Sequence, residues 1–251
     1  MRIIVNGAAG RMGAELLRMI ENGARGAELA AAVDRAGGDG ILTSLEDFNG
    51  NADVIIDFSH HSAISSLLAY ARSRHIPVVV CTTGHTCDDI EEIREASKYI
   101  PVFHSGNMSV GIAVLIKLAA EAAAAFPEAD IEIVETHHNR KLDAPSGTAL
   151  MLADGIRNVR PDAYNNCGRS GNKKREPREI GISAIRRGNI VGIHEVLIST
   201  DTQTLTLKHE AHSRSLFAEG AIAAADYLYK CPTGLYNMDD MLKAVNESIA
   251  K

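Results

Sequence analysis

The chain has 251 residues, of which 45% are apolar and 23% charged, and its formal net charge is −6. These proportions are typical of a globular protein with a buried core and exclude a disordered chain. The excess of acidic residues argues against a nucleic acid or an anionic membrane surface as a partner.

The length and the absence of targeting signals favour a two-domain cytoplasmic protein. The chain exceeds the usual size of one domain. Its first residues lack the basic start and apolar core of a secretory signal, and no apolar run reaches the roughly 18 residues that cross a bilayer. The four cysteines, Cys81, Cys87, Cys167 and Cys231, are dispersed. This spacing favours reduced thiols in a cytoplasm over a disulfide framework.

The first hundred residues alternate between strand and helix patterns. Apolar and β-branched runs predict a strand at 2–5, a second that ends at Asp34, and further strands within 52–59, 76–84 and 100–107. Continuous apolar runs are typical of strands buried on both faces, and the intervening helical patterns indicate a parallel sheet with right-handed crossovers.

The pattern changes after residue 107. A long alanine-rich helix at 110–126 leads into a strand-like stretch at 130–138 and a second helical pattern at 143–159. Region 179–211 contains three strand-like stretches separated by turn residues, which predicts adjacent antiparallel strands. Segment 161–178 has no apolar period and predicts an exposed, mobile loop. We therefore expect an α+β second domain at 108–214 with a mixed, partly open sheet, whereas the helical patterns of 215–251 return to complete the first domain.

A glycine loop, Gly7-Ala8-Ala9-Gly10-Arg11-Met12-Gly13, lies between the first strand and the first helix. Its backbone N–H groups and the positive helix end suit a pyrophosphate, although the usual spacing would place glycine at position 8 and an ordinary tight turn is the alternative. Asp34, about 20 residues later, is placed to bind a ribose 2′-OH, and Arg35 could hold a 2′-phosphate. A solvated charged turn is the alternative for this pair. Together these features predict a Rossmann-type domain at 1–107 that binds NADH, NADPH or both.

Two more segments follow predicted strands of this sheet, at the edge where parallel α/β sheets bind ligands. These segments are Cys81-Thr82-Thr83-Gly84 and Ser105-Gly106-Asn107-Met108. Both are candidates to contact the nicotinamide half of the cofactor, although turn formation alone would explain their glycines. His60 and His61, which end the third strand, are more typical of surface residues than of ligands.

The polar segment 135–148 is the most informative part of the sequence. His137 and His138 leave a strand in opposite directions, so they are expected to have different roles. A histidine can supply a proton at cellular pH, and Lys141 nearby can pair with an anion or donate a proton. The small residues Ser146-Gly147-Thr148 predict a helix start that suits a carboxylate or phosphate. A basic surface loop before a capped helix is the alternative.

These motifs together resemble the dihydrodipicolinate reductase, or 4-hydroxy-tetrahydrodipicolinate reductase, family of lysine and diaminopimelate biosynthesis. The resemblance covers nearly the whole chain, and its longest block is specific to the family. The matching motifs are G-A-A-G-R-M-G at 7–13, Asp34-Arg35, T-T-G at 82–84, E-x-H-H-x-x-K-x-D-A-P-S-G-T-A at 135–149 and I-R-x-G-x-I-V-G-x-H at 185–194.

The resemblance implies an enzyme that transfers hydride from NADH or NADPH to a cyclic imine dicarboxylate, with loss of water and protonation of an enamine-like intermediate. His137 would be the general acid/base and Lys141 a proton donor or charge stabiliser. The resemblance also implies a homotetramer built through the sheet of the second domain. The substrate would be held by His138, Ser146, Gly147 and Thr148, and the cofactor by Gly7 to Met12, Asp34, Arg35, Cys81 to Thr83 and Ser105 to Met108.

Two departures from the family pattern leave the choice of cofactor open. Cys81 stands where the family often has glycine, and Ser59-His60 replaces a hydroxyl-arginine pair. A different NAD(P)-dependent dehydrogenase, for example one acting on aspartate, and a nucleotide-sensing regulator are the competing interpretations, and neither needs the histidine-lysine segment. No metal is expected, because the sequence has no C-x-x-C and His209-Glu210-Ala211-His212 lacks the H-E-x-x-H spacing.

Overall fold

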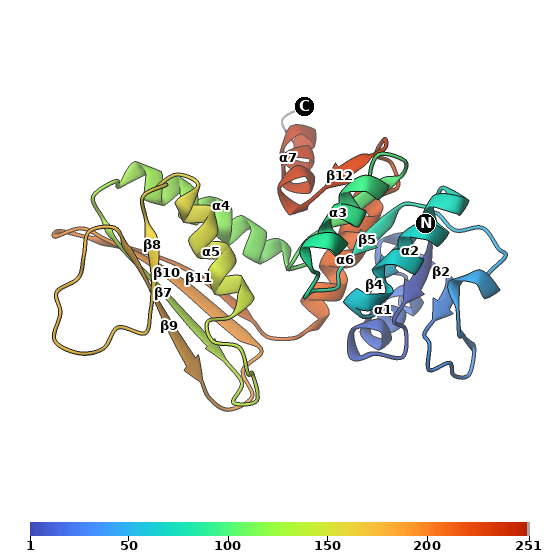
Figure 1. The fold of residues 1–251 in the computed structure, drawn as a ribbon, viewed down its shortest axis with the longest axis horizontal. Coiled ribbons are helices and arrows are strands. Elements are labelled where there is room, and N and C mark those ends of the chain that lie inside the picture. Colours follow the sequence, from blue (N-terminus) through green and yellow to red (C-terminus); the bar gives the residue numbers. More distant parts are fainter. Residues whose placement is uncertain (250–251) are drawn as a thin grey trace. The chain divides into compact units, whose positions relative to one another are not determined.

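The computed structural model describes residues 1–249, and the chain forms two compact units (Figure 1). Unit 1 contains residues 1–109 and 215–251, and unit 2 contains residues 110–214. The chain passes from unit 1 to unit 2 where helix α4 begins at Val110, two residues after the expected boundary. No helix within residues 1–249 is long and apolar enough to cross a membrane.

Unit 1 is built on a seven-stranded sheet in which all neighbouring strands are parallel. The strand order is β12-β6-β5-β4-β1-β2-β3, so the order reverses between β1 and β4 as in a doubly wound sheet. The strands are β1 (Arg2–Asn6), β2 (Glu28–Val33), β3 (Ile41–Leu42), β4 (Val54–Asp57), β5 (Val78–Val80), β6 (Pro101–His104) and β12 (Gly234–Tyr236).

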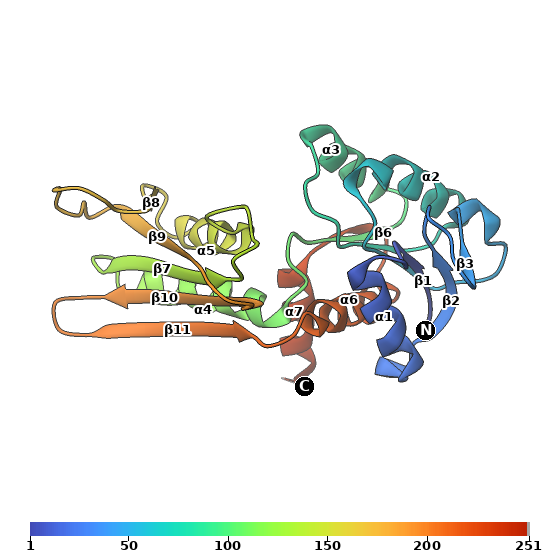
Figure 2. The same cartoon turned by 90° about the horizontal axis from the view of Figure 1, so that it is seen from below.

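Helices cover both faces of this sheet, as the continuous apolar strands require. Ile4, Ile55 and Val78 pack with apolar residues of α2 and α3. Helices α1 and α6 contact each other on the other face, and α6 also contacts β4, β5 and β6. Figure 2 shows the two helix pairs on opposite sides of the strands. The helices are α1 (Arg11–Glu21), α2 (Ile64–Arg74), α3 (Cys87–Ala96), α6 (Ser215–Leu228) and α7 (Met238–Ile249).

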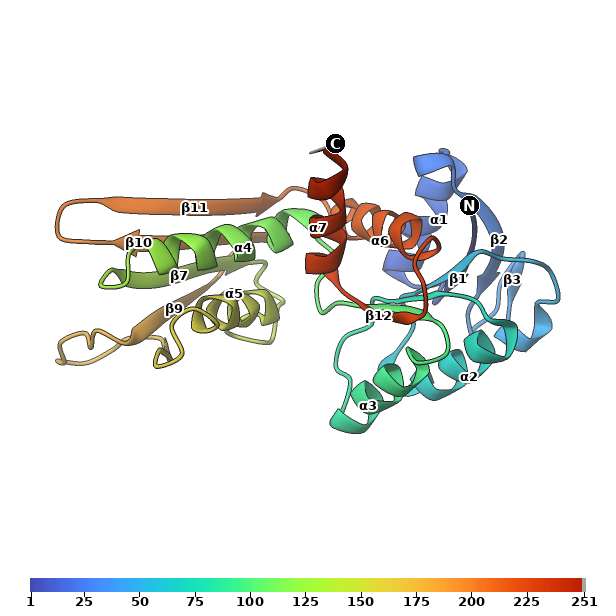
Figure 3. The same cartoon turned by 90° about the horizontal axis from the view of Figure 1, so that it is seen from above.

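Unit 2 has a five-stranded mixed sheet with strand order β11-β10-β7-β9-β8. Strands β8 and β9 and strands β9 and β7 pair in parallel, whereas β10 is antiparallel to both β7 and β11. Helices α4 (Val110–Ala125) and α5 (Gly147–Arg157) pack on one face of the sheet, as Figure 3 shows. The strands are β7 (Asp130–His137), β8 (Tyr164–Cys167), β9 (Glu179–Arg186), β10 (Gly192–Ser199) and β11 (Thr204–Ala211). The predicted fold class, a Rossmann-type domain with a second mixed-sheet domain, is confirmed.

Three details of the sequence prediction were wrong. Strands β9 and β10 are not neighbours, because β7 lies between them, and only β10 and β11 form the expected antiparallel pair. Segment 161–178 is not entirely loop, since β8 lies inside it and pairs with β9. The edge strands β3 and β12 were not predicted, because two or three residues are too short to show a strand period.

Candidate cofactor and substrate sites

The glycine loop of unit 1 contains glycines that the local packing requires. Gly7 has a φ of +82°, and a Cβ there would lie 2.6 Å from the carbonyl of Phe58. A Cβ at Gly13 would lie 2.1 Å from the Gly7 oxygen. Because Gly7 makes the tight turn, Ala8 is tolerated where the usual motif has glycine. Helix α1 begins after Gly10, which has no side chain to cap the first N–H groups, so these groups are suited to an anionic ligand.

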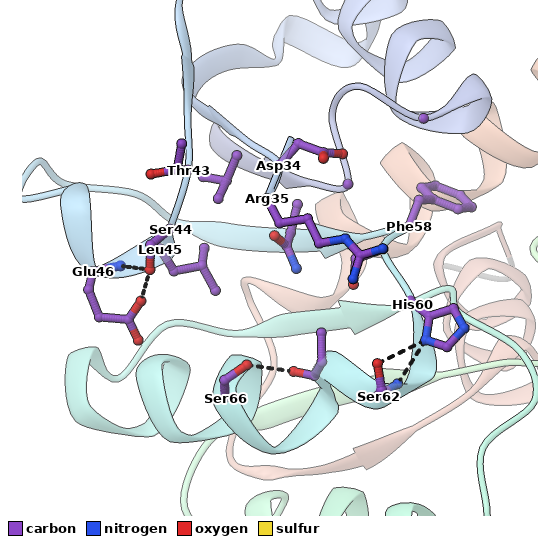
Figure 4. A pocket seen from close by; sticks show the side chains of 16 residues that line it. Asp34, Arg35, Thr43, Ser44, Leu45, Glu46, Phe58, His60, Ser62 and Ser66 are labelled. Atoms are coloured by element: carbon purple, nitrogen blue, oxygen red, sulfur yellow. Dashed lines mark hydrogen bonds between the residues drawn. The ribbon is translucent and has the colours of Figure 1, made fainter. Parts of the chain in front are cut away.

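Asp34 connects the end of β2 to this loop. Its carboxylate accepts hydrogen bonds from the N–H groups of Ala9 (3.2 Å) and Ala36 (3.0 Å). Asp34 and Arg35 line a cavity of about 400 Å³ together with Gly7 and Gly10 (Figure 4). This volume falls within the range of small-molecule sites, and the Arg35 side chain extends across the cavity toward His60. The residues present therefore fit the adenosine end of a dinucleotide.

His60 is exposed, as the sequence suggested, but it also lines this cavity, which the sequence analysis missed. Its Nδ1 accepts a hydrogen bond from the Ser62 N–H at 3.3 Å. Since that nitrogen is the acceptor, the neutral ring carries its hydrogen on Nε2. His61 lies elsewhere, with its Nδ1 3.8 Å from an Asp89 oxygen.

A buried carboxylate, Asp57, is hydrogen-bonded to residues at the carboxyl ends of three adjacent strands. It accepts hydrogen bonds from Asn6 Nδ2 (2.7 Å), Ser59 Oγ (2.6 Å) and Thr82 Oγ1 (2.6 Å). These residues end or follow β1, β4 and β5. The sequence analysis did not single out Asp57, although an acidic residue that ends a wholly apolar strand was a usable signal.

The segment after β5 presents its candidate residues differently. The Cys81 side chain is buried, and burial raises the pKa of its thiol well above the usual value. The Thr82 hydroxyl is directed to Asp57, whereas Thr83 is exposed. Only Thr83 therefore offers an exposed side chain here, and Cys81 and Thr82 could serve a ligand mainly through their backbone.

The segment after β6 forms a turn held by its own side chains. Ser105 Oγ donates to the Asn107 carbonyl at 2.8 Å, and Asn107 Oδ1 accepts from the Ser109 N–H at 2.8 Å. Gly106 is exposed, whereas Met108 is buried against α6. The backbone at Gly106 is thus the accessible part of this predicted cofactor segment.

In unit 2 a second buried carboxylate, Glu135, lies at the centre of the candidate substrate site. Its oxygens accept hydrogen bonds from His137 Nδ1 (2.6 Å), from both terminal nitrogens of Arg186 (2.7 and 2.8 Å) and from the Ser146 N–H (3.0 Å). Burial alone would raise the pKa of Glu135, but the hydrogen bonds from His137, Arg186 and Ser146 outweigh it and lower this pKa to about 2.

Strand register explains how this cluster forms. Glu135 and His137 are two residues apart on β7, so their side chains share one face of the sheet. Arg186 on β9 is paired with His137, and His194 on β10 is paired with Glu135. All four side chains therefore lie on the face that α5 covers, at the end where Ser146 caps α5 through the Ala149 N–H.

His194 is a neutral neighbour of this ionised cluster. Its ring meets that of His137 edge-on, with centroids 5.1 Å apart, and its Nε2 lies 3.2 Å from Ser146 Oγ. Burial, with a smaller contribution from the charge of His137, lowers the pKa of His194 to about 4. The ring is therefore uncharged at neutral pH.

His138 and Lys141 have different surroundings from His137. His138 Nε2 lies 3.5 Å from an Arg214 nitrogen, and burial together with nearby cationic side chains lowers its pKa. Lys141 Nζ pairs with Asp143 at 2.9 Å and not with either histidine. Burial would raise the pKa of Asp143, but this lysine hydrogen bond lowers it. Gly147 begins α5 in open space, since a Cβ there would meet nothing within 4 Å.

The structure thus links His137 and Ser146 through Glu135, which accepts a hydrogen bond from each, and leaves Lys141 on a separate ion pair. The sequence analysis named the motifs that contain Glu135, Arg186 and His194 but did not assign these three residues to the site. Their signal was present, because all three fall within the two family blocks at 135–149 and 185–194. Within the described residues no cluster of histidine, cysteine or carboxylate side chains is arranged to hold a metal ion.

Comparison with known proteins identifies one family across both units. The family described as "Dihydrodipicolinate reductase, N-terminus" matches residues 1–108, and "Dihydrodipicolinate reductase, C-terminus" matches residues 111–242. A 4-hydroxy-tetrahydrodipicolinate reductase of Clostridium novyi (strain NT) is 43% identical over 251 residues, with 98% of this chain and 99% of the relative covered. A second reductase of that name, from Caldanaerobacter subterraneus subsp. tengcongensis, is 44% identical over 97% of this chain and 98% of its own length.

Solved structures agree with this assignment at the level of the fold. A dipicolinate-bound dihydrodipicolinate reductase from Paenisporosarcina sp. TG-14 superposes with a TM-score of 0.79 at 24% identity, covering 94% of this chain and 97% of that one. An aspartate dehydrogenase from Thermotoga maritima reaches a TM-score of 0.51 at 15% identity, covering 93% and 99% of the two chains. With both halves of the chain matched and full-length relatives above 40% identity, the protein belongs to the dihydrodipicolinate reductase family of nicotinamide-dependent oxidoreductases.

Proposed function

We propose that this chain catalyses the NAD(P)H-dependent reduction of 4-hydroxy-tetrahydrodipicolinate to tetrahydrodipicolinate, with loss of water, in lysine and diaminopimelate biosynthesis. The observation that carries the proposal is the buried Glu135–His137 pair beside the start of α5, within the motif block specific to the family. The alternative of an aspartate-type dehydrogenase explains the cofactor fold but not this cluster.

Unit 1 binds the cofactor, which when bound supplies a hydride to the conjugated ring of the substrate. N–H groups within Gly7 to Met12, a segment that includes the start of α1, hold the pyrophosphate, and Asp34 accepts a hydrogen bond from the adenosine ribose. The backbone around Cys81 to Thr83 and Ser105 to Met108 contacts the nicotinamide half. These roles are supported by the glycines that the loop geometry requires and by the Asp34 carboxylate beside the loop.

Unit 2 binds the substrate and supplies the proton. His137 donates a proton to the enamine-like intermediate left by hydride addition, and Lys141 stabilises negative charge or relays a proton. His138, Gly147 and Thr148 bind the substrate carboxylates, aided by the positive end of α5, which Ser146 caps. Together the steps consume one hydride and one proton and release one water, so the atoms and charges balance.

Both cofactors are accepted in this proposal. Asp34 favours the free 2′-OH of NADH, whereas the adjacent guanidinium of Arg35 can pair with the 2′-phosphate of NADPH. Support comes from the two side chains, which line the same cavity (Figure 4).

The assay follows oxidation of NADH or NADPH by pure protein, with and without freshly formed hydroxytetrahydrodipicolinate. Oxidation is expected only with the substrate present. His137→Ala and Lys141→Ala should fold and turn over about 10²-fold more slowly or worse, because each loses a proton-transfer or charge-stabilising group. His212→Ala and Lys117→Ala, at exposed positions, are the matched controls. Wild-type rates in both site variants would refute their roles, and substrate-independent rates in the wild type would refute the activity.

The functional form is proposed to be a cytoplasmic homotetramer assembled through the sheet of unit 2. The face of this sheet opposite α4 and α5 carries Ile185, Ile193 and Leu197, since alternate residues of each strand point away from the helices. Sedimentation or light scattering of the pure protein measures the assembly. A charged substitution, Leu197→Asp, is expected to dissociate it.

A further inference from the structure

The carboxylate behind His137 has a role in the geometry of proton transfer. We propose that Glu135 is a positioning residue for His137: it holds the ring as the tautomer with hydrogen on Nδ1, so that Nε2 is the atom that exchanges a proton with the substrate. This inference rests on the proposed function, in which His137 is the proton donor.

The charge of Glu135 is determined by its surroundings. Its side chain has no solvent-exposed surface, and Arg186 contacts both of its oxygens. The Ser146 N–H completes the set of donors around the carboxylate. A carboxyl group in this environment is ionised at neutral pH, and an ionised carboxylate can only accept hydrogen bonds.

The Glu135 carboxylate determines the tautomer of His137. Nδ1 lies 2.6 Å from Glu135 Oε2, which is a short hydrogen-bond distance. Because the carboxylate has no hydrogen to give, the hydrogen in this bond belongs to Nδ1. The neutral ring therefore has a free electron pair on Nε2, and the protonated ring has its transferable hydrogen there.

A glycine on the neighbouring strand leaves space beside Nε2 of His137. Gly192 on β10 faces this atom, and a Cβ at that position would lie only 3.1 Å from it. The absence of a side chain at Gly192 thus keeps the working nitrogen uncrowded. The ring of His194 on β10 lies 5.1 Å from the His137 ring, and Arg186 on β9 shares the Glu135 carboxylate with it. Lys141, in the loop before α5, pairs with Asp143, and its charge acts on His138 and His194.

The kinetic test compares Glu135→Gln with Glu132→Gln. Both residues lie on β7 and pair with an arginine, but Glu132 pairs with Arg175 outside the site. Glu135→Gln is expected to lower kcat about 10²-fold or more, because an amide no longer dictates the tautomer, while substrate KM changes little. The limb of the pH–rate profile that requires protonated His137 should move to lower pH, because the nearby negative charge is gone. Glu132→Gln should change neither.

A second readout does not depend on turnover. Nitrogen-15 NMR of histidine-labelled protein reports which ring nitrogen carries hydrogen, and the His137 signals are assigned by their loss in His137→Gln. The wild type should show the Nδ1–H form, and Glu135→Gln should show a mixture or the Nε2–H form. Glu132→Gln should keep the wild-type spectrum.

The outcomes separate this inference from the proposed function. A wild type that does not reduce the substrate refutes the proposed function, whereas the tautomer is measured without substrate. An Nε2–H wild type, or a folded Glu135→Gln variant with wild-type kcat and pH profile, overturns the positioning role. If Glu135→Gln fails to fold, the wild-type spectrum alone decides between the two forms.

Discussion

The two glycines of helix α5 are explained by different features of the structure. In α5, a Cβ at Gly147 would meet nothing within 4 Å, whereas a Cβ at Gly155 would lie 2.6 Å from the Ile116 side chain. Packing against α4 therefore explains Gly155. It does not explain Gly147, where the proposed function places a substrate carboxylate close to the backbone.

Alanine substitutions at Gly147 and Gly155 should therefore have opposite effects. Gly147→Ala should leave the free energy of unfolding unchanged or raise it by up to about 1 kcal/mol, because alanine is the better helix former. It should raise the substrate KM about tenfold, because a methyl group obstructs the first turn of α5. Gly155→Ala should do the reverse, lowering stability with little effect on KM. Steady-state kinetics and thermal unfolding of both variants measure this, and an unchanged KM in Gly147→Ala would argue against a carboxylate at this helix start.

In the proposed function, the preference between NADH and NADPH depends on Arg35. Arg35→Ala should lower kcat/KM with NADPH about tenfold or more, because the 2′-phosphate loses its cationic partner, and should change kcat/KM with NADH little. Arg94→Ala, which removes an exposed arginine of α3 paired with Glu91, is the control. Equal losses with both cofactors would mean that Arg35 does not contact the 2′-phosphate.

At the scale of elements, the order of strands in unit 2 decides which residues meet. The link between β9 and β10 passes the end of β7, where the N–H groups of His138 and Asn139 donate to the carbonyls of Ile190 and Gly188. This crossing brings the block at 185–194 to the block at 135–149. Arg186 and His194 therefore converge on Glu135, although Arg186 is 51 residues away from it in the sequence.

The sequence could predict the helices and strands whose apolar residues recur with a strong period. It could not predict that Glu135, Arg186 and His194 converge. Buried strands such as β4 and β5 and the helix start at Ser146 have local signals, and the structure contains them. The placement of β7 between β9 and β10 has no local signal, because a short link with turn residues favours a hairpin. Without that order, Glu135 could be assigned to the same face as His137 but not to a partner.

Helix α6 depends on one close contact within unit 1. A Cβ at Gly220 would lie 1.7 Å from the Met108 carbonyl oxygen, a backbone atom that cannot move aside alone. Gly220→Ala should therefore lower the free energy of unfolding by about 2–4 kcal/mol and weaken cofactor binding. Ala223→Gly in the same helix should cost only about 1 kcal/mol through helix propensity. Chemical denaturation and cofactor titration measure both, and a fully stable Gly220→Ala would show that α6 can shift away from Met108.

At the scale of the whole molecule, the buried polar groups of the two units have different arrangements. Unit 1 ties strand ends together with Asp57, at the edge of an otherwise apolar sheet. Unit 2 buries the Glu135–Arg186 pair and the neutral His194 at one end of its sheet. Buried groups with lowered pKa values make folding depend on pH, so the cluster in unit 2 is expected to make the chain less stable in acid.

The lowered pKa values of His194 and Glu135 determine whether acid raises or lowers the free energy of unfolding. The pKa of His194 is lowered to about 4 in the folded protein, so between its ordinary value of 6.5 and pH 4 the unfolded chain binds a proton that the folded chain does not. The pKa of Glu135 is lowered from 4.5 to about 2, which has the same effect at lower pH. Stability conferred by both groups is therefore present at neutral pH and lost as the pH falls, first through His194 and then through Glu135.

The expected result is a free energy of unfolding that falls by on the order of 2 kcal/mol between pH 7 and pH 4, and a Tm that falls by about 5 °C or more. Thermal unfolding across this range measures it. His194→Gln removes the titrating ring but keeps a polar side chain, so it should flatten the decline above pH 4.5. The loss below pH 4.5 should remain, because there Glu135 takes up a proton in the unfolded chain but not in the folded one. A His194→Gln variant with the wild-type slope would mean that the buried ring is not the source of the acid sensitivity, because glutamine binds no proton in either state.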